Sequence, residues 1–239
     1  MSFVSSLFAV PRRNTARYAG LLYLLMAITA AFSLLTLPSK VIVKGNPAQT
    51  LQNLLTHEAL VRWVMVSHFA CHSIFLLLAM TLHRLFKGVH EHSAWLMVLF
   101  VTVQVPLVFI GEVFSYSALM IAKGELMQSL EAVDKADFVM LLLKIRSYCF
   151  LSAQVFWGLW LIPLGRLTFS SGFMPRILGV MLVSGGVAYL IQTAAYLLVP
   201  EQSSTIISVV YPVHTIAEIS MILWLLIIGT TDQNSISPS

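Results

Sequence analysis

The chain alternates between long apolar runs and short polar segments. An apolar run of about 20 residues is long enough to cross the hydrocarbon core of a bilayer as an α-helix. Six such runs are present: 18–37, 63–86, 95–121, 147–167, 177–199 and 213–229. Lipid offers the backbone no hydrogen-bond partners, so each run is expected to form a complete helix. The pattern predicts an all-α membrane protein, a six-helix transmembrane bundle forming a single domain over 18–229.

A polar segment between the first two predicted spans has the features of a short surface helix. Asn46 followed by Pro47 is a helix-start signal, because the Asn side chain caps the first turn and proline fits its first position. Leucines recur among polar residues over 49–62, which predicts an amphipathic helix leading into the second span. Glu58 and Arg62 are four residues apart, so we expect them to pair on one face.

Three further polar segments flank the predicted spans. The segment 123–138 is amphipathic and is expected to extend the fourth helix beyond the bilayer. This extension would lift Lys144 and Arg146 toward the lipid headgroups. We expect 1–17 to be a cytoplasmic N-terminal segment and 230–239 to be a disordered polar tail.

The composition supports a chain that resides in lipid. Hydrophobic residues make up 58% and charged residues 10% of the 239 residues, whereas soluble domains have about 45–50% and about 25%. So few charges cannot cover a soluble surface, which excludes a soluble globular domain, a disordered chain and a nucleic-acid-binding module. Cys71 and Cys149 lie in apolar runs and form no CxxC motif, so no disulfide framework is expected.

The basic residues predict the orientation in the membrane. The net charge is +4, and the basic residues divide equally between the two sides of the predicted bundle. The cluster of Arg12, Arg13 and Arg17 beside the first span breaks the tie, because cytoplasmic flanks carry the excess of positive charge. Both termini are therefore expected in the cytoplasm. The first span continues unbroken to Leu37, beyond the length of a signal-peptide core, which predicts an uncleaved anchor.

Ionisable side chains within the predicted spans are the first candidates for a functional site. Each costs about 3 kcal/mol at bilayer depth, and such residues are often functional. In the sixth span, Tyr211, His214 and Glu218 are three and four residues apart and share one helix face. His214 is the nearest candidate partner for Glu218. The face predicts either a site for a cation or polar ligand group, or a structural hydrogen bond between helices.

The third predicted span carries a second buried acid. Glu112 lies deep in this span, and Gln104 precedes it by two turns. Pro106 lies between them, where proline frees a backbone carbonyl and bends the helix. This arrangement predicts either a polar pocket or hydrogen bonds between helices.

The second span contains a pair of histidines with metal-ligand spacing. His68 and His72 are four residues apart, which allows two imidazoles of one helix to bind one metal ion. Further ligands would be needed, for which Glu112 and Glu218 are candidates. Both imidazoles project from the same side, so they cannot be opposite axial ligands of one haem. The alternative is polar packing between helices.

The fourth and fifth spans carry aromatic and polar side chains. Gly185, Tyr189, Gln192 and Tyr196 form one continuous face, which favours a helix–helix seam, with ligand contacts as the alternative. The fourth span adds residues that either line an apolar slot or face lipid: Tyr148, Ser152, Gln154, Trp157 and Trp160.

Five stretches resemble a known family in their order and spacing. They lie at 17–25, 48–62, 103–104, 171–191 and 218–229, and the most specific is Ser171-Gly-Phe-Met-Pro-Arg-Ile-Leu-Gly179. The chain resembles, over nearly its whole length, the bacterial membrane-protein family called domain of unknown function 4386. The resemblance implies a multi-helix protein of a bacterial inner membrane and supplies no catalytic residues.

Three functional hypotheses remain. The first is a protein that binds or passes a small or lipophilic ligand in a polar intramembrane pocket. The second is a structural or assembly subunit that contacts other membrane proteins, and the third is an intramembrane metal- or haem-dependent redox enzyme using His68 and His72. Whether the protein is an enzyme stays open, and the first two hypotheses lean against it; the partners expected are lipid, the ligand and other membrane subunits, not nucleic acid. The candidate ligand-binding residues are Glu112, Glu218, His214, Gln104, Gln192, Tyr189 and Trp157.

Overall fold

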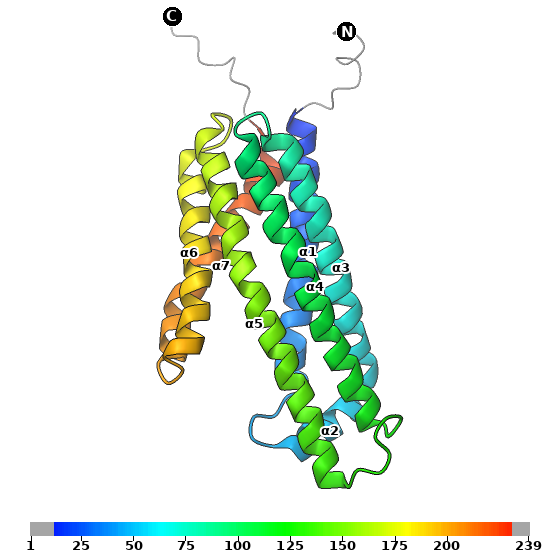
Figure 1. Cartoon of the computed structure of the whole chain (residues 1–239). Coiled ribbons are helices and arrows are strands. Elements are labelled where there is room, and N and C mark those ends of the chain that lie inside the picture. Colours follow the sequence, from blue (N-terminus) through cyan, green and yellow to red (C-terminus); the bar gives the residue numbers. More distant parts are fainter. Residues whose placement is uncertain (1–11, 231–239) are drawn as a thin grey trace, which may run out of the picture. The chain divides into compact units, whose positions relative to one another are not determined.

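The computed structural model describes residues 12–230, and these residues form seven α-helices and no strand (Figure 1). The helices are α1 (Arg12–Lys40), α2 (Pro47–Thr56), α3 (Glu58–Phe86), α4 (Glu91–Ala122), α5 (Ala132–Ser170), α6 (Arg176–Leu198) and α7 (Ser203–Ile227). Within this part of the chain, six helices, all except α2, are long and apolar enough to cross a membrane. The predicted all-α fold class is confirmed, and the six apolar helices indicate a multi-pass membrane protein.

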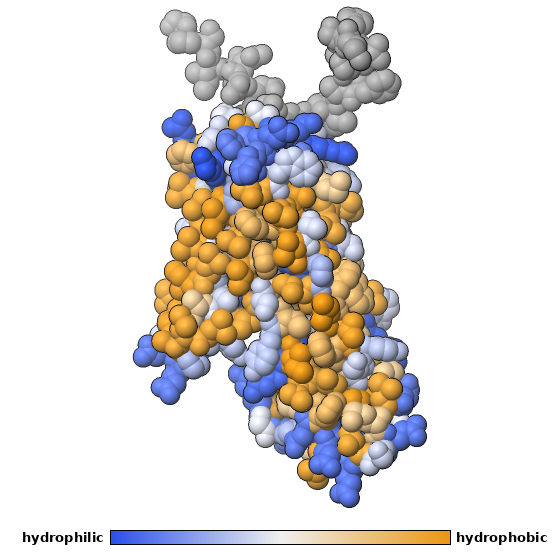
Figure 2. Space-filling model, in the orientation of Figure 1, coloured by the Kyte–Doolittle hydropathy of each residue, from blue (hydrophilic) through white to orange (hydrophobic). Residues whose placement is uncertain are grey.

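The surface of the long helices is apolar over most of their length. Figure 2 shows hydrophobic side chains along the middle of the helices and hydrophilic side chains at helix ends and connecting loops. The shortest of the six, α6, has 23 residues, a length of about 35 Å at 1.5 Å per residue. This exceeds the hydrocarbon thickness of about 30 Å.

The helices extend beyond the predicted spans. α5 begins at Ala132 rather than at residue 147, and α7 begins at Ser203 rather than at residue 213. α7 continues through Pro212 because membrane helices accommodate a proline without ending. Residues 12–17, assigned to the N-terminal segment by the sequence, belong to α1. The rest of that segment and the predicted tail from 231 onward lie outside the described residues.

The predicted surface helix is two helices, not one. The Asn46 side chain accepts a hydrogen bond from the Gln49 N–H at 3.0 Å, and Pro47 is the first helical residue, which confirms the start signal. The helix ends at Thr56, and His57 caps it with its own N–H bonded to the Asn53 carbonyl. α3 then begins at Glu58, so the single helix predicted over 49–62 is wrong.

Ion pairs tie the start of α3 to the end of α4. Glu58 and Arg62 are 2.8 Å apart, which confirms the predicted pair. Lys123 lies 3.1 Å from the same Glu58 oxygen and 2.8 Å from Glu125. Hydrogen bonds to Glu125 and then to Glu58 raise the pKa of Lys123, because both favour its charged form. These groups are solvent-accessible, so they contribute little to stability.

Internal contacts divide the described chain into two compact units. Unit 1 comprises residues 12–24, 75–101 and 155–230. Unit 2 comprises 25–74 and 102–154. α2 belongs to unit 2, α6 and α7 belong to unit 1, and each of the other four helices contributes one segment to each unit.

Unit 1 is packed through glycines. A Cβ atom added to Gly158 of α5 would lie 2.7 Å from the Gly186 carbonyl oxygen of α6, and one added to Gly165 would lie 2.6 Å from that of Gly179. α5 and α6 are therefore in backbone contact, the arrangement that small residues permit in membrane helices. α6 and α7 lie side by side in the same unit (Figure 1). These small residues of α5 and α6 thus pack against a helix of the same chain.

Unit 2 has an apolar core at the end that carries α2. Its side chains come from the last turns of α1, from α2, and from the adjoining segments of α3, α4 and α5. The fully buried members include Leu37, Leu54, Val64, Leu119 and Val139. This core holds the helices around the polar cluster described below.

Candidate functional site

The first polar cluster lies in unit 1 around Glu218 of α7. The Tyr23 hydroxyl of α1 donates to Glu218 Oε2 at 2.8 Å, and the Tyr189 hydroxyl of α6 donates to Oε1 at 2.8 Å. Tyr23 is fully buried, whereas Glu218 and Tyr189 are half-buried. Together with Gln192 and His214, these three residues are called the Glu218 cluster below.

Two glycines explain how hydroxyls from two other helices reach the carboxylate. Gly20 lies about one turn before Tyr23, and a Cβ there would be 2.8 Å from the Leu226 backbone nitrogen of α7. Gly185 lies about one turn before Tyr189, and a Cβ there would be 3.2 Å from the His214 Cα atom. The missing side chains let α1 and α6 approach α7 closely, as small residues do in membrane bundles.

His214 contacts Gln192 and Tyr189 rather than Glu218. Its Nε2 lies 3.3 Å from the Gln192 amide oxygen, to which it donates in the matching tautomer. Its ring stacks on Tyr189, with ring centroids 3.8 Å apart. The prediction that His214 is the partner of Glu218 is therefore wrong. Gly185, Tyr189 and Gln192 of the predicted seam of α6 contact α7, whereas Tyr196, the fourth residue of that face, is exposed.

Aromatic rings surround the Glu218 cluster. The Trp157 ring lies edge-on to Tyr189, with centroids 6.2 Å apart. Trp160 is almost completely buried beside Tyr23 and Phe75, at centroid distances of 5.7 and 4.7 Å. The option that Trp160 faces lipid is wrong. Unit 1 thus places an acidic group among the faces and edges of aromatic rings.

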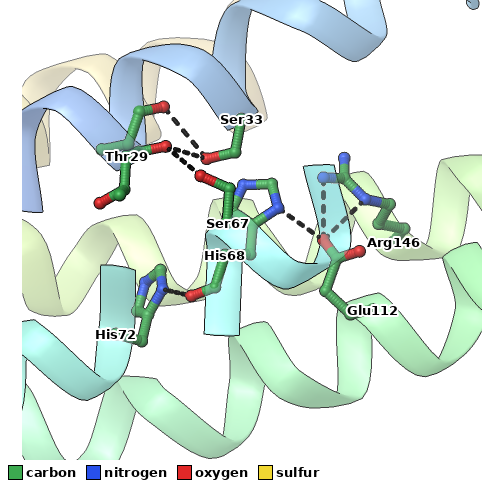
Figure 3. Close-up of polar contacts among 8 residues, drawn as sticks. Thr29, Ser33, Ser67, His68, His72, Glu112 and Arg146 are labelled. Carbon is green, nitrogen blue, oxygen red and sulfur yellow. Dashed lines mark hydrogen bonds and ion pairs between the residues drawn. The ribbon is translucent and has the colours of Figure 1, made fainter. Parts of the chain in front are cut away.

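The second polar cluster lies in unit 2 around Glu112 of α4. Arg146 of α5 donates from Nε and Nη2 to Glu112 Oε1 at 3.2 and 3.0 Å. His68 Nδ1 of α3 lies 2.9 Å from the same oxygen, as Figure 3 shows. All three residues are buried, and the exposed fraction of Glu112 and of His68 is 1%. With His72 they are called the Glu112 cluster below.

Arg146 corrects an expectation drawn from the sequence. It does not extend toward headgroups but is buried in unit 2, where its guanidinium also lies 4.3 Å from the Phe150 ring centroid. Gly111, next to Glu112, permits this contact, since a Cβ there would lie 3.0 Å from the Phe150 ring. A buried arginine needs a paired carboxylate, and Glu112 is the acid within the predicted third span that could supply it.

The histidine pair makes other contacts than the spacing predicts. His72 Nδ1 donates to the His68 carbonyl oxygen at 2.9 Å (Figure 3), and the two ring centroids are 6.4 Å apart. Among residues 12–230, no three His, Cys, Asp or Glu side chains are grouped so that they could hold a metal ion. His68 and His72 therefore belong to a cluster in which Glu112 is paired with Arg146 and lies beside His68.

The remaining polar candidates divide between the two units. Gln104 is fully buried on α4 in unit 2, two turns before Glu112. Glu112 Oε2 and His68 Nε2 are buried and have no hydrogen-bond partner among the described residues. Of the seven predicted ligand-binding residues, the structure brings five together in unit 1: Glu218, His214, Gln192, Tyr189 and Trp157. Tyr23 and Arg146 are the two residues that sequence reasoning missed.

Comparison with known families assigns the chain. Residues 18–229 match the family described as domain of unknown function (DUF4386). The chain belongs to this family. No curated protein and no solved structure matches it. The description of DUF4386 carries no activity, so the chemistry of this member has to be argued from the two clusters.

The two clusters of this DUF4386 chain differ in charge balance. Glu112 faces a guanidinium and an imidazole at ion-pair distance. Glu218 faces two neutral hydroxyls, and no Lys, Arg or His among residues 12–230 forms an ion pair with it. A carboxylate accepts up to about four hydrogen bonds, so each Glu218 oxygen can accept one more. Glu112 Oε2 also has room for a donor, so what distinguishes Glu218 is that it has no cationic partner among the described residues.

Proposed function

We propose that this protein is a multi-pass protein of the bacterial inner membrane, with both termini in the cytoplasm, that binds or passes a small or lipophilic ligand at the Glu218 cluster. The observation that carries the proposal is the carboxylate of Glu218, held by Tyr23 and Tyr189 and half-buried among aromatic rings. The family assignment and the six apolar helices support the membrane location. The arginine cluster at the start of α1 supports the orientation.

The geometry of the cluster favours recognition over packing alone. Tyr23 and Glu218 are 195 positions apart in the chain, and Tyr189 joins them from a third helix. Both carboxylate oxygens are fixed before any ligand arrives. Such preorganisation lowers the entropic cost of binding.

The degree of burial points the same way. An ionisable residue in a membrane span costs about 3 kcal/mol, which a purely structural contact does not need to incur. Many Ser and Thr hydroxyls in this chain bond to carbonyls of their own helix, as Thr193 does on α6, although Ser67 of α3 donates to the Thr29 carbonyl of α1. Glu218 is instead bonded to hydroxyls from two other helices.

The proposal is tested by native mass spectrometry of the protein extracted gently from its own membrane. The expected result is a co-purifying non-lipid mass on the wild type that is lost or much reduced in Tyr189→Phe, which removes one hydroxyl donor to Glu218. Tyr196→Phe is the matched control, because Tyr196 lies on the same helix and is exposed. A wild type that carries no such mass, or equal retention in both variants, would contradict the proposal.

A further inference from the structure

The charge of Glu218 has no compensating cation within unit 1. Arg17, from the first turns of α1, donates to the Ile227 carbonyl oxygen at 3.2 Å, about two and a half turns beyond Glu218 on α7. His214 lies about one turn from Glu218, but its Nε2 is directed at Gln192. No ion pair of the described residues includes Glu218.

The hydroxyl donors match an ionised carboxylate. An ionised carboxylate is acceptor-only, and Glu218 receives one hydroxyl donor on each oxygen. Neutral donors spread the charge but do not cancel it. Burial alone favours the neutral acid, whereas an adjacent cation favours the ionised form that these two donors match, so a cation is the partner that suits this arrangement.

Resting on the function proposed above, we propose that the ligand of the Glu218 cluster is an organic cation, an ammonium group attached to an apolar body. The ammonium would pair with Glu218 between the Tyr23 and Tyr189 hydroxyls. The apolar body would lie against the rings of Trp157, Tyr189 and His214.

The rings around the carboxylate favour this chemical class. Aromatic faces attract ammonium groups, by about 0.5–2 kcal/mol each according to how dry the site is. Trp157 lies edge-on to Tyr189 at 6.2 Å, and the His214 and Tyr189 rings stack at 3.8 Å. A bare divalent ion would instead need several oxygen ligands, whereas here one carboxylate stands among hydroxyls that already donate to it.

Three probes that share a phenyl ring and are of similar size test the charge requirement directly. Phenethylammonium is the cation, phenethyl alcohol its neutral analogue and phenylacetate its anionic analogue. Saturation binding of labelled phenethylammonium is measured on the full chain in lipid nanodiscs, and empty nanodiscs correct for partition into lipid. The other two probes are added as competitors.

The variants locate the binding at the carboxylate. Glu218→Gln keeps the size of the side chain and removes the charge. We therefore expect the affinity for phenethylammonium to fall at least about tenfold, because an ion pair is lost. Tyr196→Phe is expected to bind like the wild type. Size-exclusion elution and thermal unfolding verify that each variant is folded.

The possible outcomes separate this inference from the proposed function. Saturable binding of the ammonium with no competition from the alcohol or phenylacetate supports the inference. Equal competition by the alcohol, or unchanged binding in Glu218→Gln, overturns the cation class while leaving a ligand site possible. No saturable binding of phenethylammonium also overturns it, and the native mass spectrum then decides the proposed function alone. The probe comparison on the wild type stands even where Glu218→Gln fails to fold.

Discussion

Units 1 and 2 each contain one glutamate in a predicted span, and the two are treated in opposite ways. In unit 2, Glu112 has an exposed fraction of 1% and lies at ion-pair distance from Arg146 and His68. In unit 1, Glu218 is half-buried and faces two tyrosine hydroxyls. A glycine lies close to each contact and brings the helices together. Both contacts rely on close helix approach, and they differ in the fixed cation, which Glu112 has and Glu218 lacks.

The largest effect is expected from removing the fixed cation of unit 2. Arg146→Met should destabilise the protein by about 3–5 kcal/mol, because it leaves the Glu112 charge buried and unpaired. Thermal or denaturant unfolding in a fixed detergent measures this. The double variant Glu112→Leu/Arg146→Met should recover much of the loss, since it removes both charges. A double variant as unstable as the single one would show that the pair is not what holds the α4–α5 contact.

The next effect tests the close approach of α1 to α7. Gly20→Ala should destabilise by about 1–3 kcal/mol, because the added Cβ would lie 2.8 Å from a backbone nitrogen that cannot move aside easily. Gly88→Ala is the matched control, since a Cβ there meets nothing within 4 Å. The same unfolding assay measures both. Equal effects of the two substitutions would contradict the tight α1–α7 contact that brings Tyr23 to Glu218.

The sequence predicted the fold because the length of an apolar run is a local property. It did not predict the partners, because these depend on contacts between distant segments. Tyr23 and Glu218 are 195 positions apart, and no periodicity links them. Arg146 was misplaced because the fourth span was drawn from residue 147, which left Arg146 in the helical extension expected outside the bilayer, and its partner Glu112 lies 34 positions away. α5 begins at Ala132. Arg146 therefore lies about four turns inside the helix.

A smaller effect is expected from the hydroxyl donors of unit 1. Tyr189→Phe should cost about 1 kcal/mol of stability, the range of hydrogen bonds between membrane helices. Tyr196→Phe should cost nothing measurable. Because the partners of Glu218 are neutral, this loss should be smaller than that of Arg146→Met in the same unfolding assay. A loss as large as that of Arg146→Met would remove the contrast between the two glutamates.

The smallest effect concerns the cap of α2, away from both clusters. Asn46→Ala removes the side-chain bond to the Gln49 N–H and should cost about 1 kcal/mol. Asn46→Asp keeps the acceptor and should be nearly neutral. The hydrogen-exchange rates of the α2 amides measure the loss of stability in this helix. Equal exchange in Asn46→Ala and Asn46→Asp would show that the cap is not what starts the helix, while leaving the comparison of the glutamates intact.

Cation binding at Glu218 is tested most directly by the shift in unfolding temperature that phenethylammonium produces in the wild type and in Glu218→Gln. A ligand that binds only the folded protein raises its unfolding temperature by mass action. We expect the unfolding temperature of the wild type to rise with the concentration of phenethylammonium and that of Glu218→Gln not to change. An equal rise in both proteins would mean that the carboxylate of Glu218 is not the group that receives the cation.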